Sequence, residues 1–237
     1  MVIKQLSLFN DDECGFISST NNLDTNIHKE NDLGILHHKL CESLSFTGRF
    51  QMPIVKKVEC EIPKNIIAFY RTRSGLFKDC IPHFYTNDHH IECLWSQPYR
   101  MVNVLRESCS LAIGPDFSVY GELLFPQKLW NIFRNKLIVA FWQQCDLISI
   151  PNISWVDGEY DLSFDGWPRN SVVAVNSTGI GRSNRCKASW TRGYKEMIKR
   201  LNPVHILRYG AKQDGEIESI STYYTNDNFK VINYGRK

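Results

Sequence analysis

The second half of the chain alternates short apolar runs with longer segments in which apolar residues recur every three or four positions. Four apolar runs have the length of buried strands, and they lie at residues 111–113, 147–150, 171–175 and 205–209. Helical spacing begins after Pro126 and returns at residues 190–201, where Asn202 and Pro203 end it. Strands that alternate with such helices predict parallel pairing. We therefore expect an α/β fold whose C-terminal half is a mostly parallel sheet flanked by helices.

The N-terminal half carries shorter apolar runs, which predict an antiparallel portion. Residues 66–70 follow Pro63 and have the composition of a strand. Residues 81–85 and 91–95 flank the sequence T-N-D-H, which is typical of a hairpin turn. We expect these two runs to pair as an antiparallel hairpin.

A polar segment without periodicity precedes the globular pattern. Asn, Asp, Ser and Thr dominate it, which predicts a flexible tether with a reach of roughly 25–30 Å for a coil of about 24 residues. The organisation that we expect is a peptide at residues 1–9, a tether at 10–33 and one α/β domain at 34–237, with an antiparallel portion at 34–100 and an alternating portion at 101–237.

The N-terminal peptide resembles a known docking motif. Residues 5–9 read Q-L-S-L-F, which is similar at every position to the Q-L-[S/D]-L-F peptide with which many bacterial proteins dock on the DNA sliding clamp. The Gln5 amide can make an oriented hydrogen bond, while Leu6, Leu8 and Phe9 can fill apolar pockets. The alternative is an ordinary N-terminal strand that packs on the domain. The motif predicts the sliding clamp as a partner.

Composition excludes several classes of protein. The chain is 43% hydrophobic and 12% aromatic, which argues against wholesale disorder. Its longest apolar run, residues 137–142, is far shorter than the roughly 20 residues of a membrane span. The N-terminus lacks the pattern of a signal peptide, and the eight cysteines form no CxxC pair. We expect a cytoplasmic protein with reduced thiols and no membrane partner.

Polar residues follow the predicted strands, and ligands of α/β sheets bind beyond the carboxyl ends of the strands. The loop after residue 175 is rich in glycine and hydroxyl groups and leads into a helix, an arrangement that favours phosphate. Trp155 offers a surface on which a base can stack. The residues that we expect to contact ligand or phosphate are Ser118, Asn152, Trp155, Ser177, Gly179, Arg182 and Arg185.

Charge is distributed unevenly, although 28 basic and 25 acidic residues give a net charge of only +3. Residues 182–200 contain seven basic side chains and one acidic side chain, and such a segment favours a phosphate partner, either DNA or a nucleotide. The loop before it has no G-K-[ST] and is not a P-loop. The alternative is a solvated basic face of a helix.

Acidic residues suggest a second chemistry. Four carboxylates lie within residues 157–165, and with Asp116 they could hold Mg²⁺ beside a phosphate. The predicted catalytic residues of a metal-dependent phosphodiesterase or nuclease are Asp116, Asp157 and Asp165. The alternative is that these acids serve turns. The histidines and cysteines of residues 80–93 could be considered as zinc ligands. Their spacing is irregular, however, and the predicted hairpin would have to distort for all of them to reach one zinc ion.

Residues 81–210 resemble an uncharacterised family of bacterial, phage and plasmid proteins that is known only as a domain of unknown function. The resemblance covers a little over half of the chain, and it departs from the family at His89 and His90, where many relatives carry acidic residues. The matching motifs are G-P-D-F-S at 114–118, Q-K-L-W-N at 127–131, I-P-N-I-S-W at 150–155, F-D-G-W-P at 164–168 and S-V-V-A-V at 171–175. The resemblance implies a phage or mobile-element context.

These features together predict a phage or mobile-element protein that docks on the sliding clamp. Its globular domain would act on or sense DNA or nucleotide phosphate and so influence replication or defence. The alternatives are a metal-dependent nuclease and a non-catalytic adaptor or inhibitor.

Overall fold

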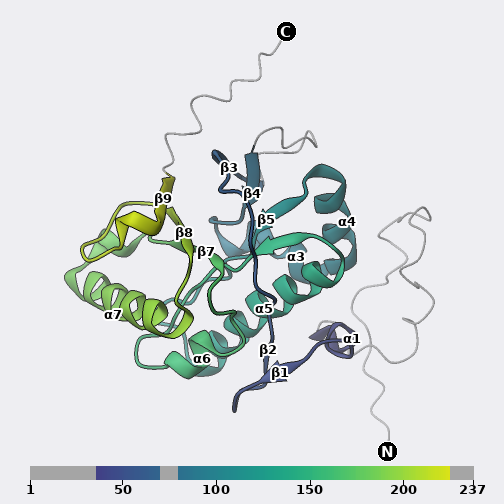
Figure 1. Cartoon of the computed structure of the whole chain (residues 1–237). Helices are drawn as coiled ribbons and strands as arrows, with labels where there is room; N and C mark the ends of the chain where they lie inside the picture. Colours follow the sequence, from purple (N-terminus) through teal and green to yellow (C-terminus); the bar gives the residue numbers. More distant parts are fainter. Residues whose placement is uncertain (1–35, 70–79, 225–237) are drawn as a thin grey trace, which may run out of the picture. The chain divides into compact units, whose positions relative to one another are not determined.

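The computed structural model of the chain describes residues 36–69 and 80–224, apart from the side chain of Arg182 (Figure 1). The clamp-like peptide at residues 1–9 and the tether at 10–33 lie outside the described residues, so both stay predictions. The described part of Lys39–Lys237 belongs to one compact unit. In the described ranges, no helix has the length and apolar character that crossing a membrane requires.

Helices and strands alternate along most of this unit. The helices are α1 (His38–Cys41), α2 (Asp88–Ile91), α3 (Cys93–Ser96), α4 (Pro98–Ser108), α5 (Phe125–Gln144), α6 (Tyr160–Phe164) and α7 (Asn184–Leu201), with short 3-10 turns η5 (Ile180–Arg182) and η6 (Glu218–Ile220). The strands are β1 (Phe46–Thr47), β2 (Met52–Pro53), β3 (Asn65–Ala68), β4 (Cys80–His83), β5 (Leu111–Ile113), β6 (Ile148–Ile150), β7 (Val172–Asn176), β8 (His205–Tyr209) and β9 (Ser221–Tyr224).

The strands β3 to β9 are neighbours in the order in which they follow along the chain. Parallel pairing joins β3 to β4, β5 to β6, and β7 to β8 and β9. Strand β4 lies beside β5, and a parallel bridge from Asn152 to Ala174 connects the residues after β6 to β7. The predicted α/β class, with parallel strands and flanking helices, is confirmed.

The sheet is strongly curled. The Tyr224 hydroxyl on β9 donates to the Pro63 carbonyl just before β3, at 2.5 Å. The ring of Tyr209 at the end of β8 lies 4.7 Å from the ring of Tyr85 and 4.6 Å from that of His83, which ends β4. Side chains from strands that are not neighbours therefore meet on one side, which we call the inner face.

Each face of the sheet buries its own apolar cluster, as the alternation of side chains along a strand requires. The inner face carries, among others, Ile66, Ile81, Ile113, Ile150, Ala174 and Leu207. On the opposite, outer face, Val173 and Val175 pack with residues of α5 and α7. The two long helices predicted from apolar spacing are confirmed, and their apolar stripes belong to the core.

The predicted hairpin around residues 86–89 is wrong. Residues 88–91 and 93–96 form α2 and α3, and β4 pairs in parallel with β3. Buried Ile91, Leu94 and Trp95 stand at helical spacing, three and four positions apart, and all pack in one core cluster. In the part of the chain that is described, the short pair β1–β2 is the one antiparallel pair. Helix α4 was not predicted.

Gly193 allows α7 to approach Trp155. A Cβ atom at position 193 would lie 2.0 Å from Nε1 and 2.1 Å from Cδ1 of that indole. Glycine to alanine normally stabilises a helix by about 1 kcal/mol, but here the methyl group displaces a packed ring. We therefore expect Gly193→Ala to destabilise the protein by about 1–3 kcal/mol in urea denaturation. A Cβ at Gly121 would meet open space, so Gly121→Ala is the control. Equal stability of the two variants would contradict this packing.

Candidate functional site

Asp116 lies at the centre of a polar cluster formed by the carboxyl ends of three strands. Its Oδ1 accepts a hydrogen bond from Asn152 Nδ2 at 2.9 Å, and its Oδ2 accepts one from Asn176 Nδ2 at 3.0 Å. Asp116 follows β5, Asn152 follows β6 and Asn176 ends β7. The structure thus brings the predicted residues Asp116 and Asn152 together, as expected for parallel strands that end at one edge.

The two amides are themselves held in place. Asn152 is buried, its Nδ2 also donates to the Pro115 carbonyl at 3.0 Å, and its Oδ1 accepts from the Tyr85 hydroxyl at 3.1 Å. Asn176 Oδ1 accepts from the backbone N–H of Thr178 at 2.7 Å. Because each amide is fixed at both ends, the orientation of the Asp116 carboxyl group is fixed as well.

Aromatic rings flank this cluster on the inner face. Tyr85 stacks on Tyr209, and His83 lies against both rings. His83 Nδ1 accepts from the backbone N–H of Tyr85 at 3.2 Å, so a neutral His83 carries its proton on Nε2. Burial, with Asp116 nearby, raises the pKa of the Tyr85 hydroxyl well above its ordinary value. Tyr85 therefore stays a neutral donor to Asn152.

The protonation of Asp116 reflects opposing influences. Burial raises the pKa of its carboxyl group, and the carboxylate of Asp88 acts in the same direction. The amides of Asn176 and Asn152 oppose this shift because they donate to the charged form.

Asp88 accepts from the Ser118 hydroxyl at 2.7 Å and from the Ser118 N–H. The predicted contact Ser118 is therefore engaged with Asp88 beside the cluster.

Helix α7 begins next to the cluster and carries the basic segment. Trp190 Nε1 donates to the Asn176 carbonyl at 3.4 Å, which attaches α7 to the end of β7. Ser183 caps the helix by accepting from the Cys186 N–H at 3.1 Å. The amino end of α7, with its unpaired N–H groups and positive dipole, therefore lies at the same edge as Asp116.

The cations of α7 fall into two groups. In the first group, Arg192 is paired with Asp157, Arg200 with Asp161 at 2.7 Å and with Glu196 at 3.3 Å, and Lys199 with Glu196 at 3.7 Å. The second group consists of Arg185, Lys187 and Lys195. Their side chains are exposed and have no acidic partner among residues 36–69 and 80–224. We call these three side chains the cationic face of α7.

The other predicted phosphate contacts have different surroundings. Ser177 is buried, and its hydroxyl donates to the Ala211 carbonyl at 2.6 Å, which ties β7 to the segment after β8. Gly179 adopts φ 82° immediately before η5, a left-handed conformation that favours glycine. Trp155 is half-buried and packs against Trp190, 5.6 Å away, and against Gly193. The side chain of Arg182 lies outside the described part of the chain.

Among the described residues, the acids predicted for metal catalysis do not gather with Asp116 into a three-ligand group. Asp157 is engaged by Arg192 and by the Tyr160 hydroxyl at 3.0 Å, and the Arg192 hydrogen bond lowers the pKa of its carboxyl group. The Asp165 carboxylate lies against Gly48. Wherever the structure describes the chain, no three His, Cys, Asp or Glu side chains gather as metal ligands. The structure therefore does not bring the three predicted acids together, and their catalytic role stays a prediction.

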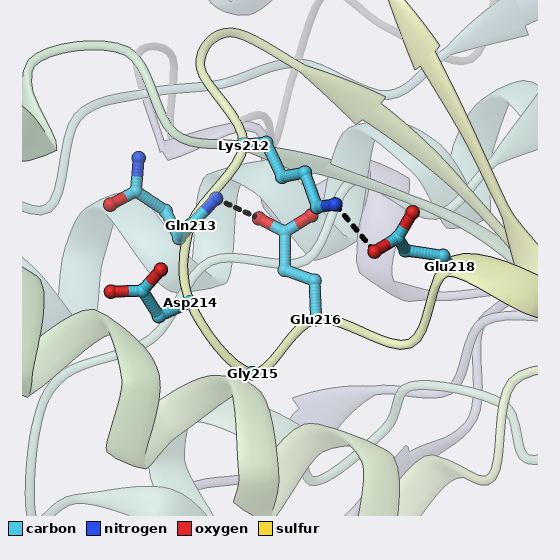
Figure 2. A pocket seen from close by; sticks show the side chains of 6 residues that line it. All are labelled: Lys212, Gln213, Asp214, Gly215, Glu216 and Glu218. Atoms are coloured by element: carbon cyan, nitrogen blue, oxygen red, sulfur yellow. Dashed lines mark hydrogen bonds and ion pairs between the residues drawn. The ribbon is translucent and has the colours of Figure 1, made fainter.

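The loop between β8 and η6 lines a surface pocket whose single lysine is paired with an acid. Figure 2 shows its lining residues, which are Lys212, Gln213, Asp214, Gly215, Glu216 and Glu218. Lys212 is paired with Glu218, and the Gln213 N–H donates to Glu216 at 2.9 Å. The exposed Asp214 has no ion pair among the described residues, so this pocket offers an anion no free cation, and the Asp116 cluster and the cationic face form the better candidate site.

Sequence reasoning missed part of the cluster. The predicted hairpin includes Tyr85 and His83, and it concealed that His83 ends a parallel strand and that Tyr85 follows it. Tyr209 and Asn176 also end strands, and Asn176 is the residue that connects Asp116 to α7. The signal that could have found all four residues is their common position at the carboxyl ends of apolar runs.

The described geometry belongs to a chain with recognisable relatives. The family described as Domain of unknown function (DUF4417) matches residues 44–230. The Gene 1 protein of Mycobacterium phage L5 is 33% identical over 129 residues, which are 54% of this chain and 56% of that protein. The Gene 1 protein of Mycobacterium phage D29 is 31% identical over 129 residues, 54% of this chain and 47% of that protein. The chain spans about half the length of these relatives, and no solved structure matches it significantly.

Proposed function

This chain belongs to the family described as Domain of unknown function (DUF4417), and we propose that it is a phage or mobile-element protein that binds nucleic-acid phosphate on α7. It docks on the DNA sliding clamp through residues 5–9, and its binding to DNA or nucleotide influences replication or defence. The phage relatives support the phage or mobile-element origin in this proposal. The role on the clamp rests on the N-terminal motif, which lies outside the described residues.

The cationic face of α7 carries the proposal for phosphate binding. Lys187 and Lys195 stand eight residues apart in one helix, about 12 Å along its axis, and nucleic acid presents several phosphates over such a span. Arg185 lies in the first turn, where the helix dipole also favours an anion. The acidic loop at Asp157 does not cancel this charge because it is already paired with Arg192.

A binding role agrees with the geometry better than the metal-dependent nuclease alternative does. The three acids predicted for catalysis do not form a three-ligand group in the described ranges, and Asp157 is held by a cation of α7. A non-catalytic adaptor or inhibitor requires only the phosphate contacts and the clamp contact. We therefore propose an adaptor that links the clamp to DNA or nucleotide.

Neutralising the cationic face tests phosphate binding. We expect Lys187→Gln/Lys195→Gln to weaken binding to a fluorescent single-stranded 20-mer roughly tenfold at low salt, because two phosphate contacts are lost. Lys64→Gln is the matched control, since Lys64 is exposed and precedes β3 at the amino end of that strand. Fluorescence anisotropy measures both affinities. Unchanged affinity of the α7 variant would rule out the cationic face as the phosphate site.

The clamp contact has its own test. We expect the full chain to bind purified bacterial sliding clamp with a Kd of roughly micromolar and Leu8→Ala/Phe9→Ala to abolish this binding, because apolar side chains supply most of its energy. Ser7→Asp is the control, since the motif accepts either residue at that position. Titration calorimetry distinguishes the variants. Binding that persists in Leu8→Ala/Phe9→Ala would refute this docking motif.

A further inference from the structure

The carboxyl group of Asp116 keeps hydrogen-bonding capacity that its neighbours do not use. Each carboxylate oxygen can accept two hydrogen bonds, and each accepts one amide N–H, from Asn152 or from Asn176. The residue as a whole is half-buried, and burial of its carboxyl group raises the pKa. Each oxygen therefore has one acceptor position left.

The remaining acceptor positions are also fixed in direction. Asn152 is anchored by the Tyr85 hydroxyl and the Pro115 carbonyl, and Asn176 by the Thr178 N–H. A carboxylate held in this way presents its two remaining acceptors without a further cost in side-chain entropy on binding. Such a group suits a ligand that offers two adjacent N–H donors, as in bidentate recognition of carboxylates.

The position of Asp116 relative to α7 limits the kind of ligand. Asn176 donates to Asp116 through its side chain and accepts from Trp190 of α7 through its backbone. Asp116 is thus linked to α7 through Asn176. A ligand that contacts both Asp116 and α7 needs N–H donors for the carboxylate and an anion for the helix, and a nucleotide combines the two.

We propose that Asp116 recognises a guanine base through the N1–H and N2–H donors of its Watson–Crick edge, an inference that rests on the proposed phosphate binding by α7. Guanine presents two adjacent N–H donors on that edge, whereas adenine, cytosine and thymine each present a single donor group there. The base must be unpaired and unstacked, as in a single strand or a free nucleotide. The ligand class is therefore a guanine nucleotide or a single strand that contains guanine.

Inosine provides a matched probe, because its base lacks the N2 amino group and is otherwise identical to guanine. We expect the full chain to bind dGMP about tenfold more tightly than dIMP in titration calorimetry, because one charge-assisted hydrogen bond is lost. Asp116→Asn should remove this preference and leave the affinity for dIMP within about twofold. The control is Asp146→Asn, an exposed acid before β6 whose φ of 60° asparagine tolerates.

The outcomes separate this inference from the proposed function. Equal binding of dGMP and dIMP, or no binding of dGMP, by the unaltered protein overturns guanine recognition whether or not Asp116→Asn folds. Phosphate binding by α7 stands in that case if Lys187→Gln/Lys195→Gln still weakens binding to the 20-mer. If that α7 variant binds the 20-mer like the unaltered protein, the proposed function fails. A preference for dGMP that persists in folded Asp116→Asn assigns the base to another residue and overturns the inference.

Discussion

Arg208→Met is expected to lower the free energy of unfolding by about 3–5 kcal/mol, because it leaves a buried carboxylate without its cation. Arg208 and Glu216 are both fully buried, and Arg208 Nη2 lies 2.5 Å from Glu216 Oε1. Arg208 also donates to the Val175 carbonyl at 2.6 Å and lies over the ring of Trp190. The ion pair therefore fixes the segment after β8 to the outer face of the sheet. Urea denaturation measures the loss.

The double variant Arg208→Met/Glu216→Leu is the control for this pair. It removes both charges together, so no unpaired charge stays buried, and apolar replacement of a complete pair is often tolerated. We expect it to recover most of the stability that Arg208→Met loses. If the double variant loses as much stability as Arg208→Met and a separate Glu216→Leu variant lose in sum, packing rather than charge explains the loss.

Lys136 is expected to make the protein more stable as pH rises above 7. Its side chain is fully buried in α5, and its Nζ donates to the carbonyls of Leu162 at 2.9 Å and Asp165 at 2.7 Å. Burial lowers the pKa of Lys136 from 10.5 to about 7, although the Asp165 charge opposes this. Between these values the unfolded chain binds more protons than the folded protein does. The free energy of unfolding therefore rises by about 1 kcal/mol per pH unit from this group.

The difference in unfolding free energy between the unaltered protein and Lys136→Met isolates the contribution of Lys136. Burial raises the pKa of the Cys109 thiol to about 11, so that group lowers stability as alkaline pH deprotonates it in the unfolded state. Both the unaltered protein and Lys136→Met contain Cys109. We expect their difference in unfolding free energy to shift with pH between 7 and 9.5 in favour of the unaltered protein. A difference that stays constant over this range would show that Lys136 remains protonated.

The parts of the fold that the sequence predicts are those with strong local periodicity. Apolar spacing predicts helices α5 and α7 and strands β5 to β8. Each of these helices buries an apolar stripe in the core, and each of these strands buries a short apolar run. The prediction for the segment that forms α2 and α3 is wrong because a short apolar run with a polar turn is compatible with a hairpin as well as with a helix. The curl of the sheet depends on contacts such as Tyr85 with Tyr209, which are distant in sequence.

The candidate site was predictable only in part for similar reasons. Asp116 and Asn152 meet because parallel strands end at one edge, a rule that needs no detailed coordinates. The pairing of Asp157 with Arg192 spans 35 residues and depends on how α7 lies against the loop before α6. Local sequence shows an acidic loop and a basic helix, but not that they partly neutralise each other. The sequence does not predict the burial of Lys136, because its acceptors are backbone carbonyls, which any residue supplies.

The salt dependence of DNA binding tests the central claim most directly, because its slope counts the phosphates that a protein neutralises. For a single-stranded 20-mer, the unaltered protein should show a linear fall of log K with log salt concentration. In Lys187→Gln/Lys195→Gln that slope should be smaller by about 1.4, or about 0.7 for each lost contact, while Lys64→Gln keeps it. A slope that is the same in the α7 variant and the unaltered protein would contradict phosphate binding on this helix.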